Sequence, residues 1–144
     1  EVQTIESYSQ SYGLNFSTNY KTLPNLTLGY NFTINDNFSD VIYVDSPTVT
    51  LEYFFLDAFS FVSEYSYYHN RNKSNTIDSE YDFLTASLMY QKKDSKWEWK
   101  LSGTNLLDTK SLDTNSFSQL GGTSTFSSYR VQPRFVILSL KYRL

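Results

Sequence analysis

The sequence predicts an all-β fold of antiparallel strands, and three observations support that prediction. Apolar and polar residues alternate with a period of two along most of the chain, as in strands with two different faces. Aromatic residues make up 18% of the 144 residues, although the mean hydropathy is only -0.44. No run approaches the roughly 18 consecutive apolar residues that a membrane-crossing helix needs.

The clearest strand is expected at residues 25–34, where the alternation has no error. One face carries Leu26, Leu28, Tyr30, Phe32 and Ile34, and the other carries Asn25, Thr27, Gly29, Asn31 and Thr33. Such a length can cross a bilayer as a tilted strand. Residues 12–20, 48–56, 59–68, 82–90, 97–105 and 134–144 follow the same pattern. The chain is therefore expected to form about seven up-and-down strands.

The connections between these segments alternate in length. Those near residues 21, 57 and 93 are short, whereas 36–46, 70–78 and 108–131 are long and rich in Asn, Asp, Ser, Thr and Gly. Bacterial outer-membrane barrels have short periplasmic turns and long outer loops. The pattern therefore predicts an antiparallel transmembrane β-barrel segment in the bacterial outer membrane, surrounded by lipid, with its carboxy terminus on the periplasmic side.

About seven strands are too few for a closed barrel, since the smallest closed barrels have eight and bacterial barrels have even numbers. Unpaired strand edges cannot remain in hydrocarbon, because each unsatisfied backbone group there costs several kcal/mol. Residues 1–144 are thus expected to be the carboxy-terminal part of a larger barrel. The remaining strands would come from the same polypeptide or from another chain. The opening Glu1-Val2-Gln3 shows no signal peptide, so this start is either a mature end or an internal cut.

Composition argues against several other classes. The chain has no cysteine and a single histidine, His69, so neither a disulfide framework nor a multi-histidine metal site is expected. Its net charge is -3 and it has no basic stripe, which argues against a nucleic-acid partner. No nucleophile with an oxyanion site is recognisable, so neither an enzyme nor a cofactor is expected.

The carboxy end is more specific. Residues 97–108 read WEWKLSGTNLLD, and after a long polar loop the chain continues as YRVQPRF at 129–135 and LSLKYRL at 138–144. These segments resemble the end of TonB-dependent receptors and related barrels of Bacteroidota. That family commonly has an Asn-Leu-aromatic-Asp element, a Pro-Arg before the last strand and a terminal Lys-Tyr-Arg-Phe. Leu107 and Leu144 replace the usual aromatic residues here.

The resemblance is strong over about the last 65 residues and rests on pattern alone elsewhere. It implies a barrel of about twenty-two strands, an amino-terminal plug domain and uptake of a large nutrient, such as a glycan, a peptide or a metal chelate. A TonB-type energy-coupling protein and a surface lipoprotein are the partners it suggests. Residues 1–144 contain no plug and no coupling box, so active transport comes from the resemblance alone.

Six charged residues are expected to face the barrel interior. Glu52 and Glu64 fall on the polar phases of neighbouring strands, and we expect them nearly opposite each other at mid-depth. They could contact a plug arginine or a cationic substrate, or simply be solvated, which is the commoner case. Near the periplasmic end we expect a structural ion-pair cluster of the interior wall, formed by Glu98, Lys100, Lys141 and Arg143.

Two further groups of residues are expected to meet the surroundings of the barrel. Rings near the periplasmic end would form an aromatic girdle at the level of the lipid headgroups; they are Tyr90, Trp97, Trp99 and Tyr142. The long segment 108–130 would be an extracellular loop that either touches a substrate or only shields the barrel mouth. Its uncharged hydrogen-bonding residues are Gly121, Gly122, Thr123, Ser124 and Thr125.

Two alternatives stay open at this point. A small self-contained outer-membrane barrel of structural or binding role would need one more strand, from the opening residues or from residues 41–44. A soluble, lipocalin-like ligand carrier would reverse the faces, with aromatic rings inside, and periodicity alone does not distinguish inside from outside. The asymmetry of the loops and the terminal strand favour the membrane barrel.

Overall fold

The structure, a computed structural model, describes residues 8–37, 40–118 and 123–143. This part of the chain forms antiparallel strands and contains no helix, which confirms the predicted all-β fold. The strands are β1 (Tyr8–Ser17), β2 (Asn25–Asn37), β3 (Asp40–Phe55), β4 (Phe59–Asn72), β5 (Asp78–Gln91), β6 (Trp97–Thr104), β7 (Ser111–Ser118), β8 (Thr123–Arg130) and β9 (Phe135–Tyr142).

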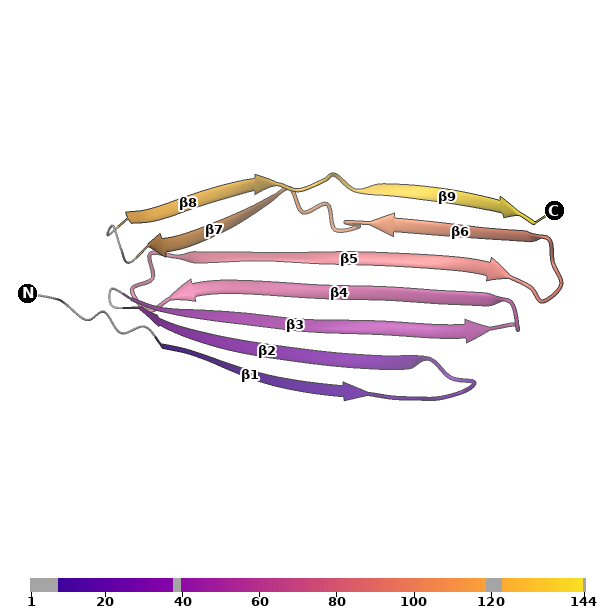
Figure 1. Cartoon of the computed structure of the whole chain (residues 1–144), viewed down its shortest axis with the longest axis horizontal. Coiled ribbons are helices and arrows are strands. Elements are labelled where there is room, and N and C mark those ends of the chain that lie inside the picture. Colours follow the sequence, from indigo (N-terminus) through magenta and orange to yellow (C-terminus); the bar gives the residue numbers. More distant parts are fainter. Residues whose placement is uncertain (1–7, 38–39, 119–122, 144) are drawn as a thin grey trace, which may run out of the picture.

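Seven of these strands form one sheet in the order β1-β2-β3-β4-β5-β6-β9, and β7 pairs with β8 in a separate hairpin (Figure 1). Each neighbouring pair in the sheet is antiparallel. The sheet is not closed, because β1 and β9 are its two edges and do not pair with each other. Seven up-and-down strands are therefore confirmed, whereas closure would require strands from outside this segment.

The strands are longer than the sequence predicted. β2 and β3 stay paired as far as Asn37 and Asp40, and β4 and β5 as far as Arg71 and Asp78. The predicted long connection at 36–46 was thus wrong, since most of its residues continue the β2–β3 ladder, and the connection at 70–78 is shortened to the turn at residues 73–77. Residues 41–44 belong to β3, so they do not supply an eighth strand. We call these continuations the strand extension and the opposite end of the sheet the short-turn end.

The segment 108–130 was predicted to be a long extracellular loop, and the structure shows that most of this connection is a hairpin. Residues 111–118 and 123–130 form the ladder of the β7–β8 hairpin, from Ser111 opposite Arg130 to Ser118 opposite Thr123. Thr123, Ser124 and Thr125 therefore belong to β8, while Gly121 and Gly122 lie outside the described residues. Figure 1 shows the hairpin lying beyond β6 and β9, beside the first part of β5.

A bulge separates this hairpin from the sheet. Thr104 pairs with Phe135, and the next pair in the same direction is Ser111 with Arg130. Six residues, 105–110, therefore lie opposite four, 131–134. Extra residues on one strand locally break the ladder and redirect the chain. β6 and β7 thus behave as one long strand interrupted by this insertion, and β8 and β9 as its partner.

Asn105 organises the bulge. It adopts a left-handed backbone conformation with φ of 51°, which asparagine tolerates better than most residues. Its side chain is almost fully buried, at 2% exposure. Its amide nitrogen donates to the carbonyls of Thr109 and Gln132, both at 2.9 Å, and its oxygen accepts the Thr109 N–H at 2.9 Å. One side chain therefore ties both strands of the bulge together.

Gly103 lies directly beneath the Leu106 side chain at the bulge. A Cβ atom there would lie 2.7 Å from Leu106 Cδ2 and 3.3 Å from Leu106 Cγ, so the leucine side chain would have to move. The backbone of Leu106 is fixed, because its N–H donates to the carbonyl of Leu84 on β5 at 2.8 Å. The Asn-Leu-x-Asp element at 105–108 thus has a structural explanation. Its Asn bonds the backbone and its Leu covers a glycine.

We predict that Asn105→Ala destabilises the protein by about 1 to 3 kcal/mol, because three backbone groups of the bulge lose the partner that the Asn105 side chain gives them. Asn105→Gly keeps the left-handed backbone accessible but also loses the hydrogen bonds. It should therefore recover only about 1 kcal/mol of the loss. Urea titration of the folded full-length protein measures both changes. A loss below about 0.5 kcal/mol for Asn105→Ala would contradict the assigned role.

We also predict that residues 1–144 do not close into a barrel on their own, because both edges of the sheet stay unpaired. Refolded into detergent, the isolated segment should migrate on gels at the same position before and after boiling. A compact, heat-modifiable monomer made from these residues alone would disprove this prediction.

Candidate functional site

The register places most of the large apolar side chains of the sheet on one face, although rings such as Tyr68, Tyr81 and Phe83 lie on the other. Paired residues of antiparallel strands share a face, so the pairs can be followed from strand to strand. Phe16 pairs with Leu28 and Leu28 with Val49. Further along, a second row joins Phe61, Leu88, Leu101 and Leu138. We call this surface the apolar face, and its opposite the polar face.

No second layer covers the apolar face within the described part of the chain. Its aliphatic side chains are largely exposed, with Leu14 at 78%, Leu138 at 62% and Leu140 at 67%. Ala58 is the one apolar residue that is fully buried among those described. A soluble monomer rarely exposes an apolar patch larger than a few hundred Å². This sheet therefore needs an apolar environment or a partner over its whole apolar face.

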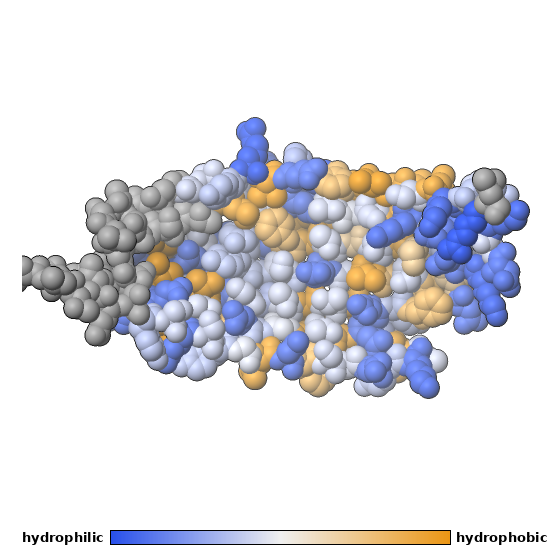
Figure 2. Space-filling view, viewed as in Figure 1, coloured by the Kyte–Doolittle hydropathy of each residue, from blue (hydrophilic) through white to orange (hydrophobic). Residues whose placement is uncertain are grey.

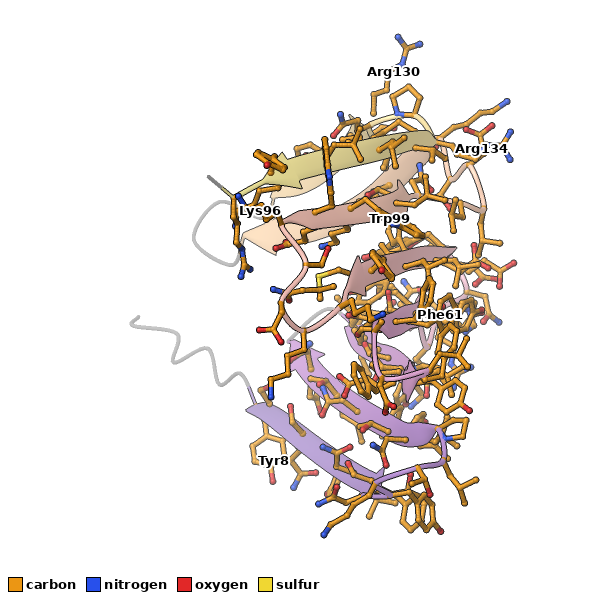
Figure 3. The ribbon with its side chains drawn as sticks, turned by 90° about the vertical axis from the view of Figure 1, so that its right-hand side faces the viewer. Tyr8, Phe61, Lys96, Trp99, Arg130 and Arg134 are labelled. Carbon is orange, nitrogen blue, oxygen red and sulfur yellow. The ribbon has the colours of Figure 1, made fainter. Side chains whose placement is uncertain are left out.

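The sheet is curved, and its curvature distinguishes a convex face from a concave face. Figure 3 looks along the strands and shows a single bowed layer, with Phe61 on the outer side of the bow. The polar face, seen in Figure 2, is mostly white to blue over the middle of the sheet. Small side chains are frequent there, and Gly29 has no room for a Cβ beside the Thr48 hydroxyl. Small residues suit the concave side of a curved sheet.

An aromatic belt crosses the apolar face near the short-turn end. Its rings are Tyr53, Phe55, Phe59, Tyr90, Trp99, Trp97 and Tyr142. Successive centroids from Tyr53 to Trp99 lie 5.0 to 5.6 Å apart, within the range of favourable ring pairs. Trp97 and Tyr142 form a further pair at 4.8 Å.

The four rings named from the sequence, Tyr90, Trp97, Trp99 and Tyr142, all lie in this belt. Sequence reasoning missed the part formed by Phe55 and Phe59, although both flank the turn at Asp57. That turn is tight, since Leu56 and Asp57 both have φ of 51° and the Ala58 N–H donates to the Phe55 carbonyl. Aromatic residues on both sides of a tight turn were the available signal.

Polar partners mark the other border of the apolar face. Tyr30 donates its hydroxyl proton to Asp45 at 2.5 Å, and Tyr67 donates to Glu80 at 2.8 Å. Beyond these tyrosines the same face carries charges, including the Arg71–Asp45 ion pair at 3.3 Å and the His69–Asp78 contact at 2.7 Å. On β4 and β5 the apolar face therefore gives way to charged residues beyond these tyrosines, whereas Phe32 and Ile34 continue it on β2.

The height of the apolar band fits a bilayer. On β4 the apolar face extends from Phe59 to Tyr67, a distance along the strand of roughly 26 Å at about 3.3 Å per residue. A tilt of about 40° reduces this to about 20 Å, close to the apolar band of about 25 Å in outer-membrane barrels. β2 to β5 have 13 to 16 residues, more than the 9 to 11 or so that a crossing strand needs.

Glu52 and Glu64 share the polar face, are exposed and lie nearly opposite each other on neighbouring strands. Glu52 pairs with Val62, and Glu64 pairs with Thr50. The two carboxylates are thus diagonal neighbours, offset by two residues. This offset reduces their mutual repulsion, because diagonal side chains are farther apart than opposed ones.

The ion-pair cluster near the short-turn end comprises three of its four predicted members. Glu98 Oε2 lies 3.2 Å from the Arg143 guanidinium and 3.9 Å from Lys141 Nζ. Lys100 occupies the same face, opposite Ser139, but makes no ion pair within the described residues. One carboxylate faces three cations here, so this part of the polar face is basic.

The turn between β4 and β5 closes the strand extension with a polar network. The Asn72 side-chain oxygen accepts the N–H groups of Thr76 and Ile77, at 2.9 and 2.8 Å. Asn72 also donates to Asp40 at 2.6 Å. Hydrogen bonds from Ser74 first, and also from the Val41 backbone and Asn72, hold the pKa of the Asp40 carboxyl below its ordinary value.

An apolar groove of about 330 Å³ lies on the apolar face where small residues align. Ser63, Ala86 and Gly103 pair successively across β4, β5 and β6. Leu106 from the bulge forms one wall of the groove, and Phe61, Leu88 and Val136 lie around it.

The described residues contain no cluster of three or more His, Asp or Glu side chains that could hold a metal ion. They also include no helix that is long and apolar enough to span a membrane. Comparison of the chain with protein-family models, with curated proteins and with solved structures finds no match.

We predict different costs for arginine at two neighbouring positions of β9. Leu138 is on the apolar face and Ser139 on the polar face. Near the middle of a lipid-facing band, Leu138→Arg should cost about 2 to 4 kcal/mol, whereas Ser139→Arg on a wet face should cost little. Unfolding of the full-length protein in lipid vesicles measures both. Equal costs for the two variants would contradict the assignment of the faces.

Proposed function

We propose that this chain is part of the wall of a bacterial outer-membrane β-barrel, completed by strands from outside the segment. The observation that carries the proposal is the uncovered apolar face, which continues through all seven strands. Hydrocarbon would cover it without a further protein layer. The aromatic belt on one side and the tyrosine and carboxylate pairs on the other match the two interfaces of a membrane.

The soluble, lipocalin-like alternative fits these observations less well. It needs the apolar side chains on the concave side of the sheet, where a ligand would be enclosed. Phe61 projects from the outer side of the curve in Figure 3, and the polar face carries the small side chains. A small self-contained barrel loses one of its two sources of an extra strand, since residues 41–44 are part of β3. The other source, the opening residues, lies at positions 1–7, outside the described residues.

Within this class we propose a TonB-dependent importer of a large nutrient such as a glycan, a peptide or a metal chelate. The support is the resemblance of residues 97–108 and 129–144 to the end of that receptor family. The Asn-Leu-x-Asp element is explained by its structural role in the bulge. Any barrel with the same bulge could therefore contain this element, whatever its function. The choice of an importer therefore depends on the sequence resemblance.

We predict that the full-length protein containing this segment is found in the outer-membrane fraction and shifts on gels after boiling. We also predict that uptake of its nutrient stops when the inner-membrane energy-coupling complex is deleted. The loss of uptake is measured by comparing strains with and without the energy-coupling complex, through their growth on single nutrients and their uptake of radiolabelled nutrient. Uptake that persists without coupling would reject the importer while leaving the barrel intact, whereas a soluble, unshifted protein would reject both.

A further inference from the structure

The two borders of the apolar face differ in charge. At the short-turn end the described cations are Lys21, Lys92, Lys93, Lys96, Lys100, Lys141 and Arg143, against the anions Asp57, Asp94 and Glu98. On the other side, the strand extension and the bulge carry the anions Asp36, Asp40, Asp45, Asp78, Glu80, Asp82 and Asp108, with His69 and the cations Arg71, Lys73, Lys110, Arg130 and Arg134. Cations therefore outnumber anions beside the aromatic belt and not on the other side, although the chain as a whole has a net charge of -3.

Three of these cations are free to bind a ligand. Lys92, Lys93 and Lys96 are exposed in the β5–β6 turn and form no ion pair within the described part of the chain. Lys141 and Arg143, in contrast, face Glu98. Lys92, Lys93 and Lys96 line a hollow of about 520 Å³ at the end of the sheet, together with Arg143 and Asp57.

The turn holds these lysines in place. The Ser95 N–H donates to the Lys92 carbonyl at 3.1 Å, and Asp94 has φ of 63°. The Ser95 hydroxyl donates to the Trp97 carbonyl and accepts the Trp97 N–H, both at 3.1 Å. The positions of the lysine backbones are therefore fixed relative to the first ring of the belt.

Lys96 connects the charged turn with the aromatic belt. Its ammonium lies 5.8 Å from the centroid of the Tyr142 ring, and that ring packs on Trp97. Figure 3 shows Lys96 at the end of the sheet nearest the viewer. An ammonium beside amphipathic rings at the border of an apolar band is an arrangement that suits a phosphate headgroup whose acyl chains lie along that band.

On this basis, and resting on the proposed membrane location, we propose that Lys92, Lys93 and Lys96 form a binding site for an anionic phospholipid. The phosphate would lie at the lysines and the acyl chains along Trp97, Trp99 and Leu101. The apolar groove at Ala86 and Gly103 would receive a chain end, since it lies six residues, or roughly 20 Å, from Trp97 along β6. The occupant is thus a bilayer lipid of the leaflet that the short-turn end faces.

The test measures lipid selectivity of the full-length protein in vesicles of phosphatidylcholine and phosphatidylglycerol. Spin-labelled versions of each lipid report the fraction immobilised at the protein surface, and their ratio gives the selectivity. We expect the protein to prefer phosphatidylglycerol. The triple variant Lys92→Gln, Lys93→Gln, Lys96→Gln should lose that preference by about tenfold or more at the site, because each lysine near a membrane surface attracts anionic lipid.

The matched control removes three exposed cations that lie away from the short-turn end of the sheet, in the triple variant Lys73→Gln, Lys110→Gln, Arg130→Gln. It should keep the selectivity of the unmodified protein. No preference for phosphatidylglycerol, or equal loss in both triple variants, would overturn the lipid site while the immobilised phosphatidylcholine still demonstrated a membrane barrel. Absence of any immobilised lipid would overturn the proposed membrane location as well.

Discussion

Strand pairing in a constant register is the constraint on which the rest of this structure depends. An alternating sequence creates two different faces in a single strand, but only pairing aligns those faces across a sheet. A shift of one residue between β4 and β5 would move Phe61 and Leu88 to opposite sides. The register instead keeps apolar residues together from β1 to β9. The aromatic belt, the exposed aliphatic band and the polar face all follow from that alignment.

How much could be predicted from the sequence differs between the two halves of the sheet. Where the alternation was regular, as at residues 25–34, 59–68 and 97–104, both the strands and their faces could be predicted. On β3, β4 and β5, beyond the level of Tyr67, the apolar face becomes charged, as at Asp45, His69 and Glu80. Both faces of the strand are then polar, so the alternation of apolar and polar residues disappears although the backbone pairing continues. Polar composition and Pro47 therefore made paired strands resemble loops.

The aromatic residues of the candidate surface could be predicted from the sequence, whereas the relative positions of its charged residues could be predicted only in part. Trp97, Trp99 and Tyr142 follow from alternation alone, whereas the diagonal placement of Glu52 and Glu64 depends on the register across a tight turn. The turn at Leu56 and Asp57 has two residues with positive φ, which nothing in a Leu-Asp pair signals. Buried Asn105 was equally hidden, because its role appears only when six residues face four across the bulge.

The bulge also separates the β7–β8 hairpin from the seven-stranded sheet, so that the lengths of the two parts can vary independently. Within the described residues, β7 and β8 pair only with each other, whereas β6 and β9 belong to the seven-stranded sheet. Because the Asn105 side chain bonds both strands of the bulge, a change in the length of the hairpin beyond it need not alter the pairs from Thr104–Phe135 to Trp97–Tyr142. The hairpin could therefore lengthen or shorten between related proteins while the sheet kept its register.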